Sequence, residues 1–265
     1  MLAAGKSIIK KISNTFQVKF GAPQLRRFYK ITLDARGMLH PRIYYQMYSA
    51  MLPLQDLDVV EIGGAAGASS IALALGMKES GKQSKLIVIE KCEGGSRLPL
   101  GDYNYNYAQI VKNLQAFDVW EQVRLFPEYL TLENGQDVLD MIKTPKIAAL
   151  IHDADGRIDR DFYLFWEHLI PGGTIIIDDC EDKAEYKEIS ERYPDGGTKK
   201  ITTYRLTQLF LEWSLLTIDH IERGTVFAHK PQDADFTKFD LAACERLVAN
   251  IMSDREAHLS AVRTA

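Results

Sequence analysis

The chain has 265 residues, of which 46% are hydrophobic and 26% are charged, with 18 glycines and 9 prolines. This composition excludes collagen-like, low-complexity and disordered proteins, and the length suffices for one large domain with a sizeable core. No apolar run approaches the roughly 18 residues of a membrane span, and lysines interrupt the apolar positions near the N-terminus. We therefore expect a cytoplasmic protein with no membrane span. The three cysteines are far apart, which favours reduced thiols over a disulfide framework or a zinc site.

The net charge of −4 is unevenly distributed along the chain. The first 36 residues carry eight lysines and arginines against one aspartate, a charge of +7, which leaves −11 for the rest. We predict a basic helical extension over residues 1–40 and a single domain over residues 41–265. The extension has Ile8, Ile9, Ile12 and Phe16 on one helical face, so contact with a membrane surface or a nucleic acid is one reading. The favoured reading places it over the acidic body of its own domain or of a second subunit, and that acidic body argues against nucleic acid as the main ligand.

Strand-like and helix-like segments alternate through the first two thirds of the domain. Short β-branched runs predict strands at 58–62, 86–89, 123–126, 147–151 and 174–177. Apolar residues at helical spacing predict helices at 44–52, 69–76, 107–117, 130–142 and 159–169, the last stopped by 171–173. The strands are apolar on both faces, as in a parallel sheet covered by helices.

The pattern changes after the fifth strand. Helical stretches at 181–193 and 204–213 precede two strands, 215–221 and 225–229, which only three residues separate. So short a link cannot hold a crossover helix, and it predicts an antiparallel hairpin. A final helix is expected at 241–252. The outline is a Rossmann-like, doubly wound, seven-stranded α/β sheet in three layers, mostly parallel with a C-terminal antiparallel hairpin.

A glycine-rich turn joins the first strand to the first helix of the sheet. Gly63, Gly64 and Gly67 stand between Glu61 and Ser69, and they allow a ligand to approach the backbone and the helix N-terminus. Glu90 ends the second strand, where a carboxylate accepts hydrogen bonds from ribose hydroxyls. The pair predicts a nucleoside cofactor site. The dinucleotide fingerprint is poorly matched and the Walker pattern is absent, because alanines occupy two of the three fingerprint positions and no Gly-Lys-Ser/Thr follows.

Carboxylates follow the fourth and fifth strands, as Asp153 and Asp155 and as Asp178 and Asp179. The carboxyl ends of neighbouring parallel strands meet at one edge of the sheet, so these like charges are expected to crowd together. A hard divalent cation relieves such crowding and takes oxygen ligands, which makes Asp153, Asp178 and Asp179 candidate metal ligands. The alternative is that these acids cap helices or favour a cationic cofactor.

The glycine turn and Glu90 resemble motif I and the ribose acid of class I S-adenosylmethionine (SAM)-dependent methyltransferases. Glu61, Gly63, Gly67 and Ser69 stand at matching positions, and the terminal hairpin is typical of the same family. The resemblance covers roughly residues 40 to 230. It implies SAM as the cofactor, bound by Glu61, Gly63, Gly64, Gly67, Ser69, Glu90 and Asp153.

The carboxylates resemble those of the metal-dependent O-methyltransferases, which include catechol, caffeoyl-coenzyme A and antibiotic-sugar enzymes. In that group an Asp-Ala-Asp-Lys-like stretch and an Asp-Asn or Asp-Asp pair bind magnesium or calcium. Asp153 to Asp155 and Asp178-Asp179 match, whereas Gly156 stands where phenol-acting members commonly place a lysine. The general base is therefore open between Asp155, which we favour, and His152.

The expected activity is divalent-metal-dependent methylation of a hydroxyl on a small molecule such as a sugar or a natural-product scaffold. The cation, Mg²⁺ or another hard divalent ion, would lower the pKa of that hydroxyl and orient its oxygen. Two alternatives remain, a metal-independent N- or O-methyltransferase and a non-catalytic nucleoside-cofactor-binding protein. A homo-oligomer is also possible, through the basic extension and the C-terminal helix.

Overall fold

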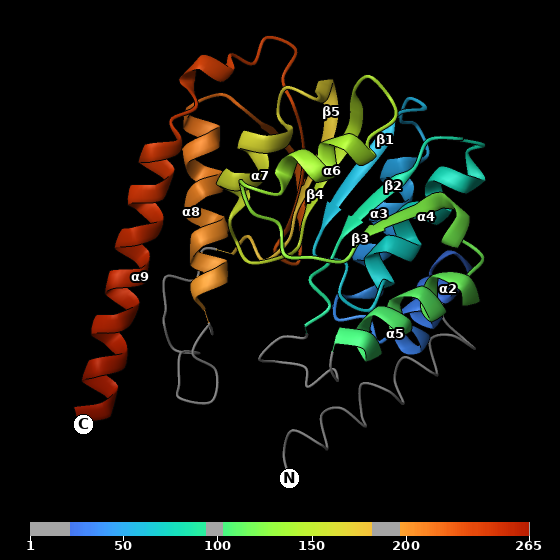
Figure 1. Cartoon of the computed structure of the whole chain (residues 1–265), viewed down its shortest axis with the longest axis horizontal. Coiled ribbons are helices and arrows are strands. Elements are labelled where there is room, and N and C mark those ends of the chain that lie inside the picture. Colours follow the sequence, from blue (N-terminus) through green and yellow to red (C-terminus); the bar gives the residue numbers. More distant parts are fainter. Residues whose placement is uncertain (1–21, 94–102, 182–196, 265) are drawn as a thin grey trace.

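The computed structural model of the chain describes residues 22–93, 103–181 and 197–264 (Figure 1). The apolar face expected around residues 8–16 and the helix expected at 181–193 lie outside these ranges, apart from Glu181. The described part contains no helix that is both long and apolar enough to cross a membrane.

A seven-stranded sheet forms the centre of the molecule, with the strand order β3-β2-β1-β4-β5-β7-β6. Its strands are β1 (Asp58–Ile62), β2 (Leu86–Ile89), β3 (Val123–Phe126), β4 (Ile147–His152), β5 (Leu169–Ile177), β6 (Thr217–Glu222) and β7 (Thr225–His229). The first five strands are parallel, and β7 pairs antiparallel with both β5 and β6. The predicted Rossmann-like sheet with its terminal hairpin is confirmed.

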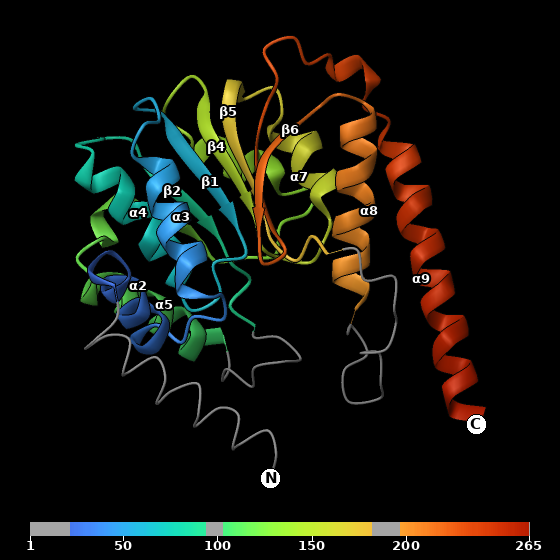
Figure 2. The same ribbon diagram turned by 180° about the vertical axis from the view of Figure 1, so that it is seen from behind.

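Helices cover both faces of the sheet (Figures 1 and 2). One face carries α2 (Pro23–Asp34), α3 (Pro41–Met51), α4 (Ala68–Glu79) and α5 (Tyr103–Ala116). The other carries α6 (Gly135–Met141), α7 (Ile158–Phe165), α8 (Thr198–Glu212) and α9 (Leu241–Thr264). Two short 3₁₀ helices complete the described elements, Trp120–Gln122 and Phe236–Lys238. The three-layer arrangement follows from strands that are apolar on both faces.

Each face of the sheet has its own hydrophobic core. On the first, α4 is buried along Ala68 to Met77 because α2, α3 and α5 surround it. Phe28 and Ile31 of α2 belong to this core, although they fall within the predicted N-terminal extension. On the second, the ring of Phe162 stacks on Trp166 and Phe210, with centroids 5.2 and 4.5 Å apart.

The region before β5 differs from the prediction. Helix α7 ends at Phe165, not at residue 169, and β5 already begins at Leu169. Ile147 pairs with Leu169 and Ala149 with Thr174, so residues 170–173 form an irregular bulge inside the strand. A proline and a glycine at φ +73° fit there because the bulge needs no regular ladder hydrogen bond.

Two predicted helices also differ in length. Helix α6 begins at Gly135 because Thr131 and Asn134 hydrogen-bond each other's backbone amides in a turn ahead of it. Helix α9 continues well past the predicted end at residue 252 and runs beside α8 in both views (Figures 1 and 2).

Candidate active site

The carboxyl ends of the parallel strands open into a cavity of about 770 Å³. Its lining includes the turn after β1, the ends of β2 to β5, the start of α8, and Val248 and Met252 of α9. A cavity of this size, with a few polar groups on an apolar wall, is typical of cofactor and small-molecule sites. Gly63, Glu90, Asp153, Asp155, Asp178 and Asp179 all line it, so the structure brings most of the predicted site residues together.

The turn after β1 requires its glycines. Gly63 has φ +97°, and a Cβ atom there would lie 2.0 Å from the Asp153 carbonyl oxygen. A Cβ on Gly64 would lie 2.5 Å from Val88 Cγ1, so the turn packs against β2 as well as β4. Gly67, at φ +89°, is the N-cap of α4, and Ala68 and Ser69 in the first turn of this helix line a small pocket next to the cavity.

Glu61 lies beneath this turn and is fully buried. Its Oε2 accepts a hydrogen bond of 2.5 Å from Ser70 Oγ, while Oε1 has no hydrogen-bond partner in the described structure. Burial raises the pKa of Glu61 to about 7, against the opposing effect of the serine hydroxyls. Ser69 and Gly64 line a small pocket next to the main cavity, whereas Glu61 and Gly67 line neither.

Glu90 stands at the end of β2, as predicted. Its Oε2 accepts the Ala65 N–H at 2.6 Å and its Oε1 accepts the Cys92 N–H at 3.1 Å. These bonds fix the carboxylate between the glycine turn and the chain after β2. Lone pairs remain on both oxygens, because a carboxylate accepts about four hydrogen bonds.

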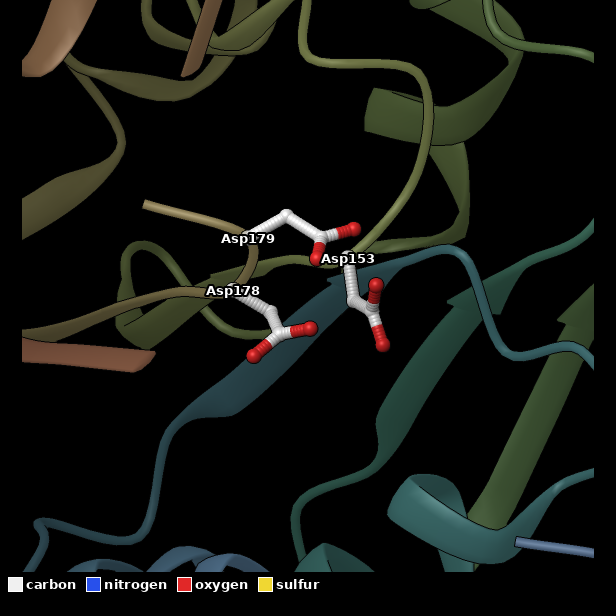
Figure 3. A group of neighbouring side chains, drawn as sticks. All are labelled: Asp153, Asp178 and Asp179. Carbon is white, nitrogen blue, oxygen red and sulfur yellow. The ribbon is translucent and has the colours of Figure 1, made fainter. Parts of the chain in front are cut away.

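Three aspartates converge from two neighbouring strand ends (Figure 3). Asp153 follows β4, Asp178 and Asp179 follow β5, and one oxygen of each lies within 4.8 Å of the other two. Thr225 of β7 donates a hydrogen bond to Asp178 Oδ1. Burial and the charges of Asp153 and Asp179 raise the pKa of Asp178 to about 7, and burial also raises the pKa of Asp153.

A lysine from α8 lies among these carboxylates. Lys199 Nζ is 2.9 Å from Asp153 Oδ1 and 2.8 Å from Asp179 Oδ2. Burial disfavours its charge, but the two carboxylates outweigh burial and raise its pKa. Its neighbour Lys200 reaches Glu181 at 3.2 Å and is 3.8 Å from Asp179.

His152 points away from the cavity and is not among the residues that line it. Its Nδ1 lies 2.5 Å from Asp161 Oδ2, and its Nε2 accepts the Gly156 N–H at 3.2 Å. Both ring nitrogens are therefore engaged, in a position that is 3% exposed. The contacts tie the end of β4 to α7.

Asp155 lines the cavity but is held by other side chains. Arg160 Nη1 donates to its Oδ2 at 2.8 Å, and the Tyr129 hydroxyl bonds the same oxygen. Although burial acts in the opposite direction, the Arg160 charge holds the pKa of Asp155 well below its usual range. This carboxylate is therefore a weak base.

Gly156 leaves no room for a side chain. Its φ is +87°, and a Cβ atom would lie 2.9 Å from the Lys199 carbonyl oxygen and 3.2 Å from Thr203 Oγ1. Helix α8 packs directly against this glycine. The close packing explains why no lysine stands here.

Several residues of the site are absent from the sequence interpretation. These are Ser70, Tyr129, Arg157, Arg160, Lys199 and Thr225, together with Val248 and Met252 of α9. Lys199 was missed because the helix was expected to begin only at residue 204, whereas α8 begins at Thr198. Tyr129 and Thr225 reach Asp155 and Asp178 across 26 and 47 residues, which no local pattern encodes. Ser70 and Arg160 lie within nine residues of Glu61 and Asp155, and the sequence interpretation assigned them no role.

All of the predicted site residues lie in a segment that matches a known protein family. Residues 60–180 match the family model described as a methyltransferase domain. The resemblance to SAM-dependent methyltransferases is thereby confirmed, and the matched segment spans β1 to the carboxylates after β5. No curated protein matches the sequence at a significant level.

Solved structures share the fold of most of this chain. The cofactor-bound protein Rv0187 from MTB is 17% identical, with 83% of this chain and 95% of that chain covered and a TM-score of 0.58. The O-methyltransferase from Bacillus cereus, solved with SAH, is 14% identical over 83% and 97% of the chains, also at 0.58. TomG from Streptomyces achromogenes, an O-methyltransferase of tomaymycin synthesis solved with SAM, is 15% identical over 79% and 90%, at 0.55.

Proposed function

We propose that the chain is a SAM-dependent O-methyltransferase that acts on a hydroxyl of a small molecule and uses a divalent cation. The observation that carries this proposal is one cavity, lined by the glycine turn, by Glu90 and by three convergent aspartates. The B. cereus O-methyltransferase and TomG, which share the fold, were solved with SAH and SAM.

The glycine turn and Glu90 are suited to SAM. Gly63 and Gly67 keep the turn free of side chains, and α4 offers backbone N–H groups to the carboxylate of the amino-acid portion. Glu90 has spare lone pairs for ribose hydroxyls. The buried Oε1 of Glu61 lacks a partner, as expected of an acceptor beneath a site for a cationic ligand.

Asp153, Asp178 and Asp179 fit a hard divalent cation in donor chemistry. They offer oxygens within 4.8 Å of one another, and two ligands on opposite sides of a calcium ion lie about 4.6–5.2 Å apart. Such a cation would supply positive charge that lowers the pKa of a nearby hydroxyl. The aspartates would hold it at the ends of β4 and β5, in the cavity that the glycine turn and Glu90 also line.

When bound, SAM would supply its methyl group to the hydroxyl oxygen of the acceptor, with the electron pair of the broken carbon–sulfur bond remaining on sulfur and SAH as the leaving group. The hydroxyl proton passes to a base. Asp155 lines the cavity and is the proposed acceptor of this proton, although its low pKa makes water at the open cavity a competing acceptor.

One observation favours a second candidate, a metal-independent methyltransferase. Lys199 already neutralises part of the charge of Asp153 and Asp179, so the aspartates are not without a counterion. In this case Asp153 and Asp178 would contact the acceptor directly. Loss of methyl transfer on addition of a chelator separates the two candidates.

Calorimetric titration of SAM, with and without Mg²⁺, tests the proposal. The variant is Asp179→Asn, since Asp179 has φ +56° and asparagine tolerates that conformation. Its control is Asp219→Asn, an exposed aspartate that pairs with His229. We expect SAM to bind all three proteins and Mg²⁺ to give a binding heat in all but Asp179→Asn. Methyl transfer to sugars, diols and phenols is then screened with labelled SAM.

The outcomes separate the parts of the proposal. Absence of SAM binding in the unmodified protein would reject the methyltransferase assignment. If SAM binding and methyl transfer persist in the presence of a chelator, the requirement for a divalent cation is rejected and the metal-independent methyltransferase is supported.

A further inference from the structure

The carboxylate cluster contains a cation of its own. The ammonium group of Lys199 lies 2.9 Å from Asp153 and 2.8 Å from Asp179, and its side chain is 23% exposed. Divalent cations bind carboxylate oxygens at about 2.0–2.6 Å. A tethered ammonium and a metal ion at this position would therefore use the same two ligands.

The two cations cannot share this position. The distance between an ion at the cluster and the ammonium in its present position would be only a few ångströms, and like charges repel strongly in a partly buried site. The ammonium also occupies a lone pair on Asp153 Oδ1 and one on Asp179 Oδ2, two of the carboxylates that a metal ion would coordinate.

The helix that carries Lys199 is fixed in place. Gly156 packs so closely against the Lys199 carbonyl oxygen that no Cβ atom fits between them. The N-terminal part of α8 therefore cannot move closer to the chain after β4, and the lysine side chain is the part with rotational freedom. Its four-carbon stem can carry the ammonium out of the cluster by rotation alone.

We infer that Lys199 is a tethered cation that occupies the divalent-cation position between Asp153 and Asp179, so that a metal ion binds only by displacing it. This inference rests on the part of the proposed function that assigns a divalent cation to the three aspartates. Lys199 holds the carboxylates together when no ion is bound. It lowers the metal affinity of the cluster, because every ion that binds must break two ion pairs.

Lys200 is the matched control. It is the next residue on α8, its side chain is 22% exposed, and its ammonium lies 3.8 Å from Asp179 but pairs more closely with Glu181. Substitution of either lysine by methionine removes one positive charge from the same region. Only the change at residue 199 removes the ammonium from between the ligands.

The experiment measures the binding of Mn²⁺ alone, by electron paramagnetic resonance of the free ion, to the full chain. We expect Lys199→Met to bind Mn²⁺ at least about tenfold more tightly than the unmodified protein, and Lys200→Met to differ by less than about threefold. Lys199→Arg retains the charge, and its affinity is expected to stay near that of the unmodified protein.

Thermal unfolding gives a second readout. Without an ion, Lys199→Met should have a lower Tm than Lys200→Met because Asp153 and Asp179 lose the ammonium that pairs with them. Mn²⁺ should raise the Tm of Lys199→Met more than that of the unmodified protein. If Lys199→Met folds only when Mn²⁺ is present, this outcome also supports the inference.

Equal Mn²⁺ affinity in the unmodified protein and in Lys199→Met would overturn the inference, as would equal gains in the two methionine variants. Failure of all variants to bind Mn²⁺ would overturn it too, because a cluster freed of its ammonium would then not be a cation site. The proposed function is tested separately by SAM binding and methyl transfer, which do not enter this titration.

Discussion

Gly63 and Asp153 approach so closely that a Cβ atom on Gly63 would lie 2.0 Å from the Asp153 carbonyl oxygen. The contact joins the end of β1 to the end of β4, and the Asp153 N–H also donates to the Ile62 carbonyl at 2.8 Å. The glycine turn and the first carboxylate of the cluster are thus one rigid unit. A change on either side must shift the other.

Substitution of Gly63 by alanine tests this relationship. We expect Gly63→Ala to lower the free energy of unfolding by at least about 2 kcal/mol more than Gly81→Ala does, measured by urea denaturation. Gly81 is a matched control, since its φ is +79° but nothing lies within 4 Å of its Cβ position. Both variants place an alanine in the left-handed backbone conformation and share that energetic cost. The difference between their free energies of unfolding therefore measures the clash at residue 63. Equal losses would contradict the close contact.

Glu61 should make stability depend on pH. Burial raises its pKa to about 7 in the folded protein, above the value of 4.5 typical of an exposed glutamate. The folded state therefore holds a proton that the unfolded state releases, and stability falls as the pH rises from about 4.5 to about 7. Glu61→Gln removes this loss, which is about 3 kcal/mol at most for a fully buried group.

Urea denaturation between pH 4.5 and 8 measures this effect. The expected curve for Glu61→Gln is flatter than that of the unmodified protein, and the exposed Glu121→Gln serves as the control. The pKa of Asp178 is also raised to about 7, so its ionisation lowers the stability of the protein over a similar pH range. The quantity of interest is therefore the difference between the curves of Glu61→Gln and the unmodified protein. Parallel curves would show that Glu61 is ionised in both states.

The buried pair of His152 and Asp161 should contribute mainly to stability. His152→Ala leaves the Asp161 carboxylate without the ring nitrogen and the Gly156 N–H without an acceptor. We expect the free energy of unfolding to fall by about 2–4 kcal/mol. His229→Ala breaks a comparable but exposed pair with Asp219 and should change it by less than about 1 kcal/mol. Lost methyl transfer at unchanged stability would instead make His152 a catalytic residue.

Substitution of Asp155 distinguishes a role in positioning Arg160 from a role as the acceptor of the hydroxyl proton. Asp155→Asn removes a partner of Arg160, which is 7% exposed and retains Asp161, so we expect a loss of about 1–3 kcal/mol in stability. If water accepts the hydroxyl proton, kcat falls by less than about tenfold. A fall of about 10² or more at unchanged SAM affinity would assign the proton to Asp155.

The sheet was predictable because its signal is local. The β-branched strands at 58–62, 86–89 and 123–126 have the predicted bounds, and the three-residue link at 222–224 fixed the direction of β7. Parallel strand order then placed Glu90 and the aspartates at one edge. The bulge at 170–173 was missed because Pro171 and the following glycines are typical of a helix stop as well as of an irregular strand.

Several contacts of the site join residues that lie far apart in the sequence, and local sequence patterns do not predict them. Lys199 reaches Asp153 across 46 residues, and Thr225 reaches Asp178 across 47. His152, the second candidate base, is buried, and its partner Asp161 belongs to another element. Lys199 and Asp161 come from helices and Thr225 comes from a strand, and the packing of these elements determines which groups meet.

The reversal of β7 has a consequence for how this cavity can diversify. The start of β7 lies beside the end of β5, so Thr225 and the Gly224 carbonyl secure Asp178 and Cys180 through a tight turn. Within the described residues, the β6–β7 turn cannot lengthen without displacing Thr225 and Gly224 from these hydrogen bonds. Val248 and Met252 of α9 line the same cavity and make none of these hydrogen bonds, so we expect substitutions there to reshape the cavity without moving the aspartates. The residues that hold the carboxylates and the residues that shape the cavity wall thus lie in different parts of the chain.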